Sequence, residues 1–172
     1  VNSAMEAQFE LKTYWSVREK EETKAGKLSI APQNRFRVEV GNDLLVSDGQ
    51  TYWQYSKKTA QVIIKNFSDL DLQMHPSQLL STFLTNYEYV EKSNSNGVNV
   101  LSWNADSENK GGYTAIEVSV ESKTGEVKVL KLTDRNGNIQ TYSFKKTVFG
   151  AKFSQKVFTF EVPQDAQVLD NR

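Results

Sequence analysis

The chain has 172 residues, the size of a single domain with a sizeable core, and we expect residues 1–172 to form one domain. Lys plus Arg and Asp plus Glu both number 21, so the chain has no net charge, and it has no local run of basic residues; we therefore expect no nucleic-acid partner. The absence of cysteine excludes disulfides, iron–sulfur ligation and a thiol nucleophile, and no apolar run approaches the roughly 20 residues of a membrane span.

Alternating apolar and polar residues predict strands near the amino terminus. From Ala7 to Val17 apolar side chains recur at every second position, which is the period of a half-buried strand. A second strand is predicted from Lys24 to Ala31 and ends at Pro32, which has no N–H to donate to a ladder. Arg35 to Val40 alternates in the same way and is followed by a turn.

The segment Leu44 to Tyr55 predicts a β-hairpin. Two runs rich in β-branched and aromatic residues flank Asp48-Gly49, a pair that supplies the positive φ angles of a tight turn. Another strand follows from Gln61 to Lys65 after a short turn. Because every connection up to this point is short, neighbouring strands must be antiparallel.

One helix interrupts the strands. Pro76 suits the first position of a helix, and Leu79, Leu80, Phe83 and Leu84 fall on one helical stripe. A helix this short is marginal in water, so we expect it to dock on the sheet by that stripe.

Strand patterns resume after the helix, separated by turns that contain glycine. With about eleven strands and a single helix, the chain is predicted to be mainly β. We expect a half-open antiparallel β-barrel, that is, a strongly curved sheet covered by a short helical lid. The later strands are predicted at Tyr87 to Lys92, Val98 to Asn104, Tyr113 to Glu121, Glu126 to Thr133, Ile139 to Lys146 and Lys156 to Val162.

No set of residues predicts catalysis, a metal site or a cofactor. His75 is the one histidine and is interpreted as a loop or capping residue, since no motif marks Ser and Asp partners for it. Asp69 and Asp71 lack the loop pattern of a calcium site, and no glycine-rich phosphate loop joins a strand to a helix. Binding of an apolar ligand or of a protein partner remains, and composition alone does not separate a ligand cavity from an ordinary packed core.

Five segments resemble, in the right order, the family of periplasmic lipoprotein carriers known as LolA-like. They are Ala4 to Leu11, Gly26 to Ile30 ("GKLSI"), Leu45 to Tyr55 ("LVSDGQTYWQY"), the late hairpin Leu132 to Phe144, and Val157 to Asp170, which is similar to the family's closing strand and proline. Each motif is modest alone, but together they span nearly the whole chain.

The resemblance implies a function as well as a fold. Members of this family are non-enzymatic carriers in the periplasm, and they shield the acyl chains of a lipoprotein in an apolar cavity beneath a helical lid. The implied partners are acylated lipoproteins, an inner-membrane ABC transporter that releases them, and an outer-membrane acceptor, with the carrier acting as a monomer. The helix from Pro76 to Leu84 would be the lid.

The cavity that the resemblance implies would be lined by apolar residues of the strands and the lid. A shift of one position on a strand exchanges its two faces, for example Trp53 for Tyr52. The candidate lining residues are Phe9, Leu11, Trp15, Leu28, Ile30, Phe36, Val38, Trp53, Tyr55, Leu79, Leu80, Phe83, Trp103, Ile116 and Phe160.

Two features depart from the family pattern. The family's Arg-Pro pair, whose arginine ties the lid to the barrel, falls at Ala31-Pro32 or Pro32-Gln33, where no arginine stands. Arg35 and Arg37 are the nearest substitutes, but Arg37 alternates with apolar neighbours and is expected to point outward. The family's first helix is also longer than the few residues that precede the first predicted strand here, which implies a trimmed chain or a smaller lid.

Two other functions are compatible with the same fold. Relatives of the carriers include regulatory domains that sense lipids or mislocalised lipoproteins and signal to a membrane partner. A hydrolase or isomerase could use the same cavity, although no catalytic constellation supports one.

Overall fold

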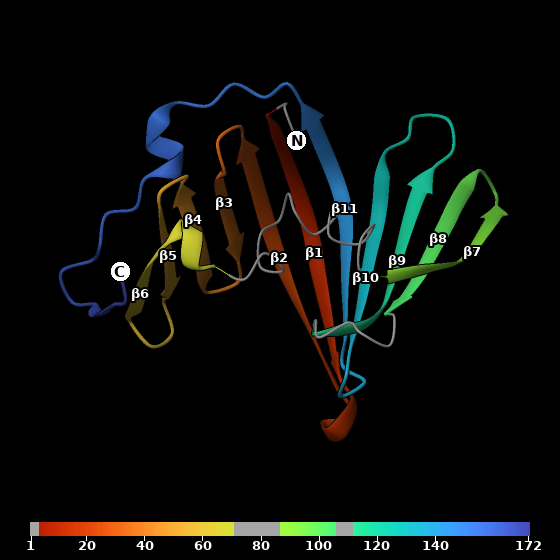
Figure 1. The fold of residues 1–172 in the computed structure, drawn as a ribbon, viewed down its shortest axis with the longest axis horizontal. Coiled ribbons are helices and arrows are strands. Elements are labelled where there is room, and N and C mark those ends of the chain that lie inside the picture. Colours follow the sequence, from red (N-terminus) through yellow and green to blue (C-terminus); the bar gives the residue numbers. More distant parts are fainter. Residues whose placement is uncertain (1–3, 71–86, 106–111) are drawn as a thin grey trace. The chain divides into compact units, whose positions relative to one another are not determined.

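The computed structural model describes residues 4–70, 87–105 and 112–172, and these are dominated by strands (Figure 1). Twelve strands belong to one sheet in the order β12-β6-β5-β4-β3-β2-β1-β11-β10-β9-β8-β7. The short helical turns in these ranges are the 3-10 helices η1 (Ser16–Arg18), η2 (Phe67–Asp69) and η4 (Gln155–Phe158). The strands are β1 (Met5–Trp15), β2 (Lys20–Ala31), β3 (Arg35–Val40), β4 (Asp43–Asp48), β5 (Thr51–Ser56), β6 (Gln61–Asn66), β7 (Tyr87–Ser95), β8 (Val98–Ala105), β9 (Tyr113–Glu121), β10 (Val127–Asp134), β11 (Ile139–Phe149) and β12 (Gln167–Asp170).

The predicted mainly-β architecture is confirmed, with corrections in its details. The sheet is open, because its order begins at β12 and ends at β7, and it has twelve described strands rather than about eleven. One pairing departs from the antiparallel expectation, since β12 runs parallel to β6. The predicted helix from Pro76 to Leu84, and with it the lid, lies outside the described residues.

The predicted strand from Lys156 to Val162 is wrong. These residues form η4 and an extended segment instead, and the last strand is the later β12. The aromatic side chains explain the difference, because Phe158 is buried against Phe153, with ring centroids 5.3 Å apart, and lies 5.6 Å below the Arg35 guanidinium. The segment packs by its side chains and does not extend the sheet.

The hairpin of β4 and β5 is confirmed, and its turn is held by side chains. One carboxylate oxygen of Asp48 accepts hydrogen bonds from the backbone N–H groups of Gln50 and Thr51, at 2.8 and 2.7 Å. Gly49 N–H donates to the Ser47 hydroxyl at 3.0 Å, and Gly49 has a φ of +99°. Ser47 and Asp48 therefore shape the turn, and the positive φ angle falls on the glycine alone.

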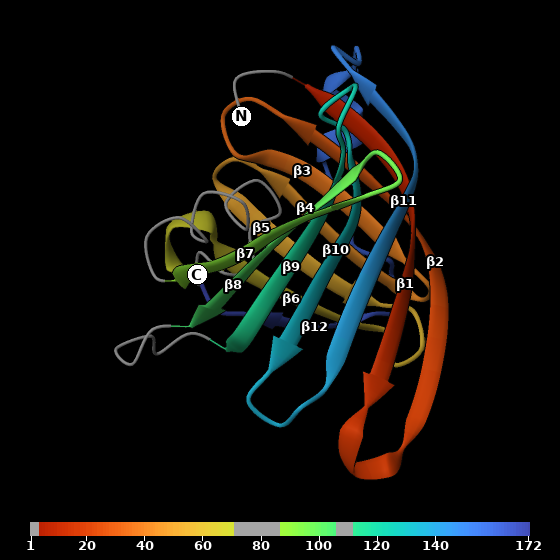
Figure 2. The same cartoon turned by 90° about the vertical axis from the view of Figure 1, so that its right-hand side faces the viewer.

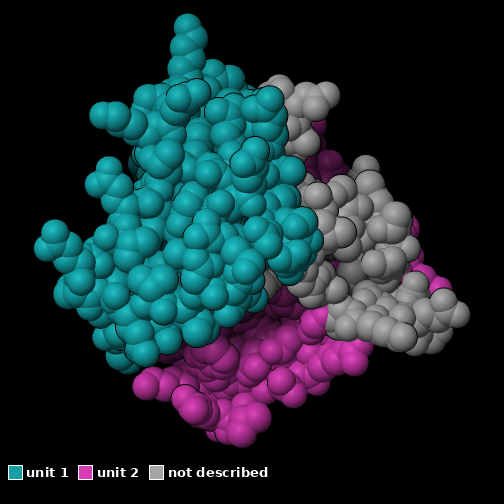
Figure 3. Space-filling model, turned by 60° about the vertical axis from the view of Figure 1, so that its left-hand side comes forward, with its two compact units in different colours: residues 1–8, 25–77, 146–172 teal, residues 9–24, 78–145 magenta. Residues whose placement is uncertain are grey.

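The chain divides into two compact units, which are coloured separately in Figure 3. Unit 1 comprises residues 1–8, 25–77 and 146–172, and unit 2 comprises residues 9–24 and 78–145. The long strands β1, β2 and β11 contribute residues to both units, so each unit is described by itself below.

In unit 1 both faces of the sheet bury apolar side chains. In antiparallel ladders directly opposed residues share a face, so the pairing of Val46 with Trp53 and of Trp53 with Ile64 defines one face, which we call the Val46 face. The carboxy-terminal segment packs there, because Phe160 lies 5.6 Å from the ring of Tyr55. The Val46 face comprises Leu44, Val46, Trp53, Tyr55, Val62 and Ile64.

In unit 2 the two faces of the sheet differ in character. A cluster of four buried residues on one face consists of Ile116, Val118, Leu130 and Leu132. On the other face Glu117 and Lys131 stand opposite each other, with the ammonium 2.8 Å from the carboxylate. This is the pattern of an antiparallel sheet with one apolar and one polar face.

The turn at Gly49 gives a test of the fold. A Cβ added to Gly49 would collide with the backbone carbonyl of Gln33, whereas at Gly97, also with positive φ, it would meet nothing within 4 Å. We expect Gly97→Ala to lower the free energy of unfolding by about 1 kcal/mol, the cost of the left-handed backbone alone. Gly49→Ala adds a steric cost and is expected to lose roughly 3 kcal/mol or more, measured by urea denaturation. Equal losses in the two variants would contradict this packing.

Candidate functional site

Unit 1 carries an apolar sheet face opposite the Val46 face. The row Ile30, Phe36, Ser47 and Tyr52 runs across β2 to β5 by direct pairing, and all four side chains are buried. A second row lies beside it and is only half-buried at Val38 and Leu45. We call this surface the Phe36 face; it comprises Leu28, Ile30, Phe36, Val38, Leu45, Ser47, Tyr52, Gln54, Ile63 and Lys65.

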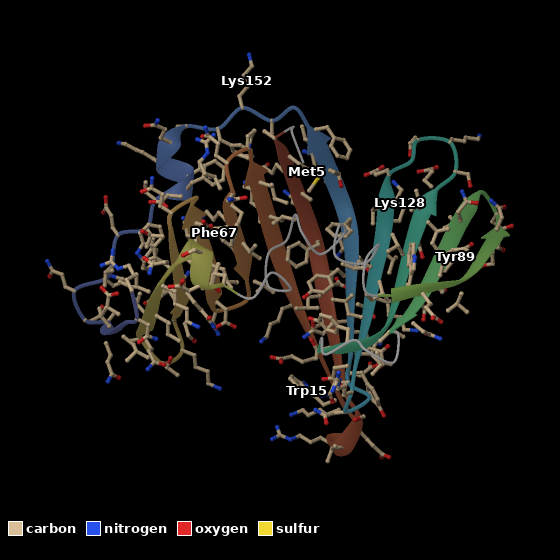
Figure 4. The ribbon with its side chains drawn as sticks, viewed as in Figure 1. Met5, Trp15, Phe67, Tyr89, Lys128 and Lys152 are labelled. Atoms are coloured by element: carbon tan, nitrogen blue, oxygen red, sulfur yellow. The ribbon has the colours of Figure 1, made fainter. Side chains whose placement is uncertain are left out.

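Unit 2 carries a second apolar face, rich in aromatic side chains. Around its four buried aliphatic residues lie half-buried aromatic residues, and Phe9 contacts two of them, with ring centroids 5.7 Å from Tyr142 and 6.1 Å from Phe144. On β7, which is labelled at Tyr89 in Figure 4, the Tyr89 ring lies 6.0 Å from Trp103. We call this surface the Leu130 face; it comprises Phe9, Leu101, Trp103, Tyr113, Ile116, Val118, Leu130, Leu132, Tyr142 and Phe144.

Each apolar face contains one tyrosine paired with a glutamine two residues away on its own strand. The Tyr52 hydroxyl donates to Gln54 Oε1 at 3.5 Å, and the Tyr142 hydroxyl donates to Gln140 Oε1 at 3.3 Å. Burial raises the pKa of the Tyr52 phenol above its ordinary value, and burial with the nearby Tyr113 raises the pKa of Tyr142 to about 12. Both phenols are therefore neutral at physiological pH, and neither adds a charge to its apolar face.

The structure divides the predicted lining residues among several surfaces. Leu28, Ile30, Phe36 and Val38 lie together on the Phe36 face, and Phe9, Trp103 and Ile116 lie on the Leu130 face. Leu11 is half-buried on β1. The predicted residues Leu79, Leu80 and Phe83 lie outside the described residues.

Four predicted lining residues are placed elsewhere. Trp53 and Tyr55 lie on the Val46 face, and Phe160 packs against Tyr55 there. The reason is the register of the hairpin, which opposes Tyr52 to Ser47 and so puts Tyr52 on the Phe36 face. Trp15 stands at the far end of β1 and is 40% exposed.

Sequence reasoning missed much of the Leu130 face. Leu130 and Leu132 alternate with Val129, Lys131 and Thr133 on β10, and they pair with Val118 and Ile116 of β9 in direct register. The alternation is visible in the sequence, and aligning the apolar positions of these two neighbouring strands would have identified the cluster. Tyr142 lies in a strand of mixed polarity, and only its pairing with Leu130 identifies its face.

Both nearby arginines have partners within unit 1. Arg35 Nε donates to the Pro32 carbonyl at 3.0 Å, and its guanidinium lies over Phe158. Arg37 Nε lies 2.6 Å from a carboxylate oxygen of Glu39. Arg37 pairs with Val46 and so stands on the face opposite Phe36, as the alternation predicted.

A polar pocket of about 450 Å³ lies in unit 1, between the sheet and the segment before η4. Its walls include the ion pairs Glu6–Lys27, at 2.9 Å, and Arg37–Glu39. These charges would be costly to cover with hydrocarbon, so we do not assign acyl chains to this pocket. Among the described residues no group of three or more His, Cys, Asp or Glu side chains could hold a metal ion, and no helix is long and apolar enough to cross a membrane.

Residues 2–161 match the protein family described as "Outer membrane lipoprotein carrier protein LolA". The chain belongs to this family. The resemblance inferred from the five sequence segments is thereby confirmed, and the family accounts for the mainly-β sheet with an apolar face.

Individual relatives agree with the family match. An outer-membrane lipoprotein carrier protein of Neisseria meningitidis is 29% identical over 161 residues, which is 90% of this chain and 75% of the relative. A protein of the same name from Vibrio cholerae is 28% identical over 151 residues, covering 86% of this chain and 73% of the relative. An uncharacterized conserved protein from Thermus thermophilus shares the fold, with a TM-score of 0.61 over 99% of this chain and 92% of its own, at 16% identity.

The buried phenol of Tyr142 predicts a loss of stability at high pH. Its pKa of about 12 lies above the ordinary value of 10, so the stability is fully present below pH 10 and is lost as the pH rises towards 12. We expect a loss of at most about 2–3 kcal/mol from this residue in that interval. Tyr142→Phe removes the ionisation and should flatten the decline, measured by urea unfolding between pH 9 and pH 12. An unchanged pH profile in the variant would contradict the burial of this hydroxyl.

Proposed function

We propose that this protein is a periplasmic carrier that binds the acyl chains of lipoproteins against its apolar sheet faces and shuttles them from the inner to the outer membrane. The observation that carries the proposal is the Leu130 face, where a buried aliphatic cluster is surrounded by aromatic side chains that are only partly buried. A fully packed core would bury those rings, whereas a ligand-binding surface leaves apolar area exposed until the ligand covers it.

The chemistry of the faces suits acyl chains. Each CH₂ removed from water contributes about 0.8 kcal/mol, so a long chain laid on aliphatic and aromatic side chains binds firmly without any charged contact. The polar groups on the Leu130 face include the neutral hydroxyl of Tyr142 and the amide of Gln140, and on the Phe36 face Lys65, which pairs with Tyr52, adds one charged group. The neutral groups tolerate the ester or amide linkages of an acylated head group.

The names of the relatives support lipoproteins as the cargo. Relatives named as outer-membrane lipoprotein carrier proteins cover most of the chain. In the proposed cycle, an inner-membrane ABC transporter loads an acylated lipoprotein, the monomeric carrier crosses the periplasm, and an outer-membrane acceptor receives the cargo where one is present. No bond is made or broken, so the carrier acts without catalysis.

The direct test compares one lipoprotein in its acylated and deacylated forms. We expect the purified protein to bind the acylated form and to leave the deacylated form in solution, measured by co-elution in gel filtration. Equal binding of both forms would contradict the proposal. A lipid-sensing domain of the same fold would bind the acylated form but would not pass it to acceptor vesicles, so a transfer assay separates carriage from sensing.

Two neighbouring residues on β8 give a matched pair of variants. Leu101 pairs with Val118 and stands on the Leu130 face, whereas Val100 pairs with Ser119 on the polar face, and both side chains are half-buried. Leu101→Glu puts a charge among the acyl chains and is expected to weaken binding of the acylated lipoprotein by roughly tenfold or more. Val100→Glu is expected to bind like the wild type. A similar loss in both variants would show that the effect is not specific to one face.

A further inference from the structure

The end of the β1–β2 hairpin forms a tip with exposed apolar residues. Val17 is 88% exposed and Trp15 is 40% exposed. Figure 4 labels Trp15 beside this turn, and Figure 2 shows the long hairpin of β1 and β2 ending at η1. At this exposure the Val17 side chain loses little contact with water on folding, so it remains available for contact with a partner.

The tip is held in place by the neighbouring turn between β10 and β11. Ser16 N–H donates to Asn138 Oδ1 at 3.0 Å, and the Ser16 hydroxyl donates to the Asn136 carbonyl. Asp134 fixes that second turn, because one carboxylate oxygen accepts from the N–H groups of Asn136 and Asn138, at 2.8 and 2.9 Å. We call the pair of turns, residues 15–20 and 134–138, the double-turn tip.

The two turns are adapted to each other. Gly137 has a φ of +76°, and a Cβ added there would lie 3.5 Å from the side chain of Ser16. Glu19 takes the left-handed conformation, with a φ of 48°, and its N–H donates to the Ser16 carbonyl at 3.4 Å. The hydrogen-bonded turns hold the backbone that carries Val17 and Trp15 in place, so binding by the tip costs little further conformational entropy.

The double-turn tip carries a small excess of positive charge. Arg18, Lys20 and Arg135 are exposed, and Glu19 is the exposed acidic residue among them. The acidic residues that follow along β2 are balanced by lysines, since Glu21 lies 2.8 Å from Lys12 and Glu22 lies 3.5 Å from Lys24. Asp134 keeps its negative charge while it accepts the hydrogen bonds of its own turn, so the tip carries the three cations Arg18, Lys20 and Arg135 against the carboxylates of Glu19 and Asp134.

We propose that the double-turn tip docks on an anionic phospholipid surface, with Val17 and Trp15 entering the interface and the basic residues contacting phosphate groups. Tryptophan prefers the boundary between head groups and acyl chains. Arg and Lys extend their charged ends to the same level. The tip lies within unit 2 but does not include the residues of the Leu130 face, so the inference goes beyond cargo binding and does not depend on it.

Flotation of cargo-free protein with vesicles tests the proposal. We expect binding to vesicles of phosphatidylcholine mixed with phosphatidylglycerol, and little binding to phosphatidylcholine alone or at high salt. The double variant Arg18→Gln and Lys20→Gln is expected to weaken binding by roughly fivefold for each cation. Equal binding to both kinds of vesicle would contradict the role of the charges. No binding to either would overturn the proposal and favour a protein partner for the tip.

A matched pair of substitutions tests the apolar contact. Val17→Asp is expected to abolish vesicle binding without lowering thermal stability, because the side chain is exposed, whereas Val162→Asp, at a valine 38% exposed after η4, keeps wild-type binding. Brominated lipids are expected to quench the Trp15 fluorescence, and Trp15→Phe to remove that quenching. Retention of binding by Val17→Asp would overturn the proposal.

The Leu101→Glu variant separates this proposal from cargo binding. It is expected to lose acylated lipoprotein yet to float with anionic vesicles like the wild type. Loss of flotation in Leu101→Glu together with retention in Val17→Asp would show that vesicle lipids bind the Leu130 face and not the tip.

Discussion

The rest of the structure depends on one constraint, namely which residues of each strand point to which face of the sheet. In an antiparallel ladder opposed residues share a face, so a single register decides the environment of every side chain on both strands. In unit 1 the pairing of Ser47 with Tyr52 aligns Tyr52 with Phe36 and sends Trp53 to the other side. The hydrogen bonds of Asp48 and Gly49 fix that register, so a local turn determines which aromatic rings are available to a ligand.

The two faces of unit 1 have different surroundings, because the carboxy-terminal segment packs on only one of them in the described structure. Phe158 and Phe160 pack on the side of Arg35 and Tyr55, and they complete a core on the Val46 face. The two arginines after Pro32 lie on the same side: Arg35 donates to the Pro32 carbonyl, and Arg37 forms an ion pair with Glu39. A chain of this family can therefore place its arginines away from the apolar face on which the proposed cargo lies.

Much of the fold could be predicted from the sequence, because period-two alternation and glycine turns identify strands directly. Arg35–Val40 and Tyr113–Glu121 are predicted with their observed ends. The alternation fails at Val157 to Phe160, where two phenylalanines two residues apart suggest a strand but pack by their rings instead. The faces of the candidate lining residues could be predicted only in part, because in a run such as Tyr52-Trp53-Gln54-Tyr55 either alternate set could face the same side, and only the pairing with β4 decides between them.

The most direct measurement is to load the protein with a lipoprotein whose acyl chain carries a photoreactive diazirine, irradiate it, and locate the adducts by mass spectrometry. The account predicts adducts on aromatic and aliphatic residues of the Leu130 and Phe36 faces, such as Trp103, Tyr142 and Val38. Adducts confined to the polar face of unit 2, at residues such as Val100 and Val129, would contradict it.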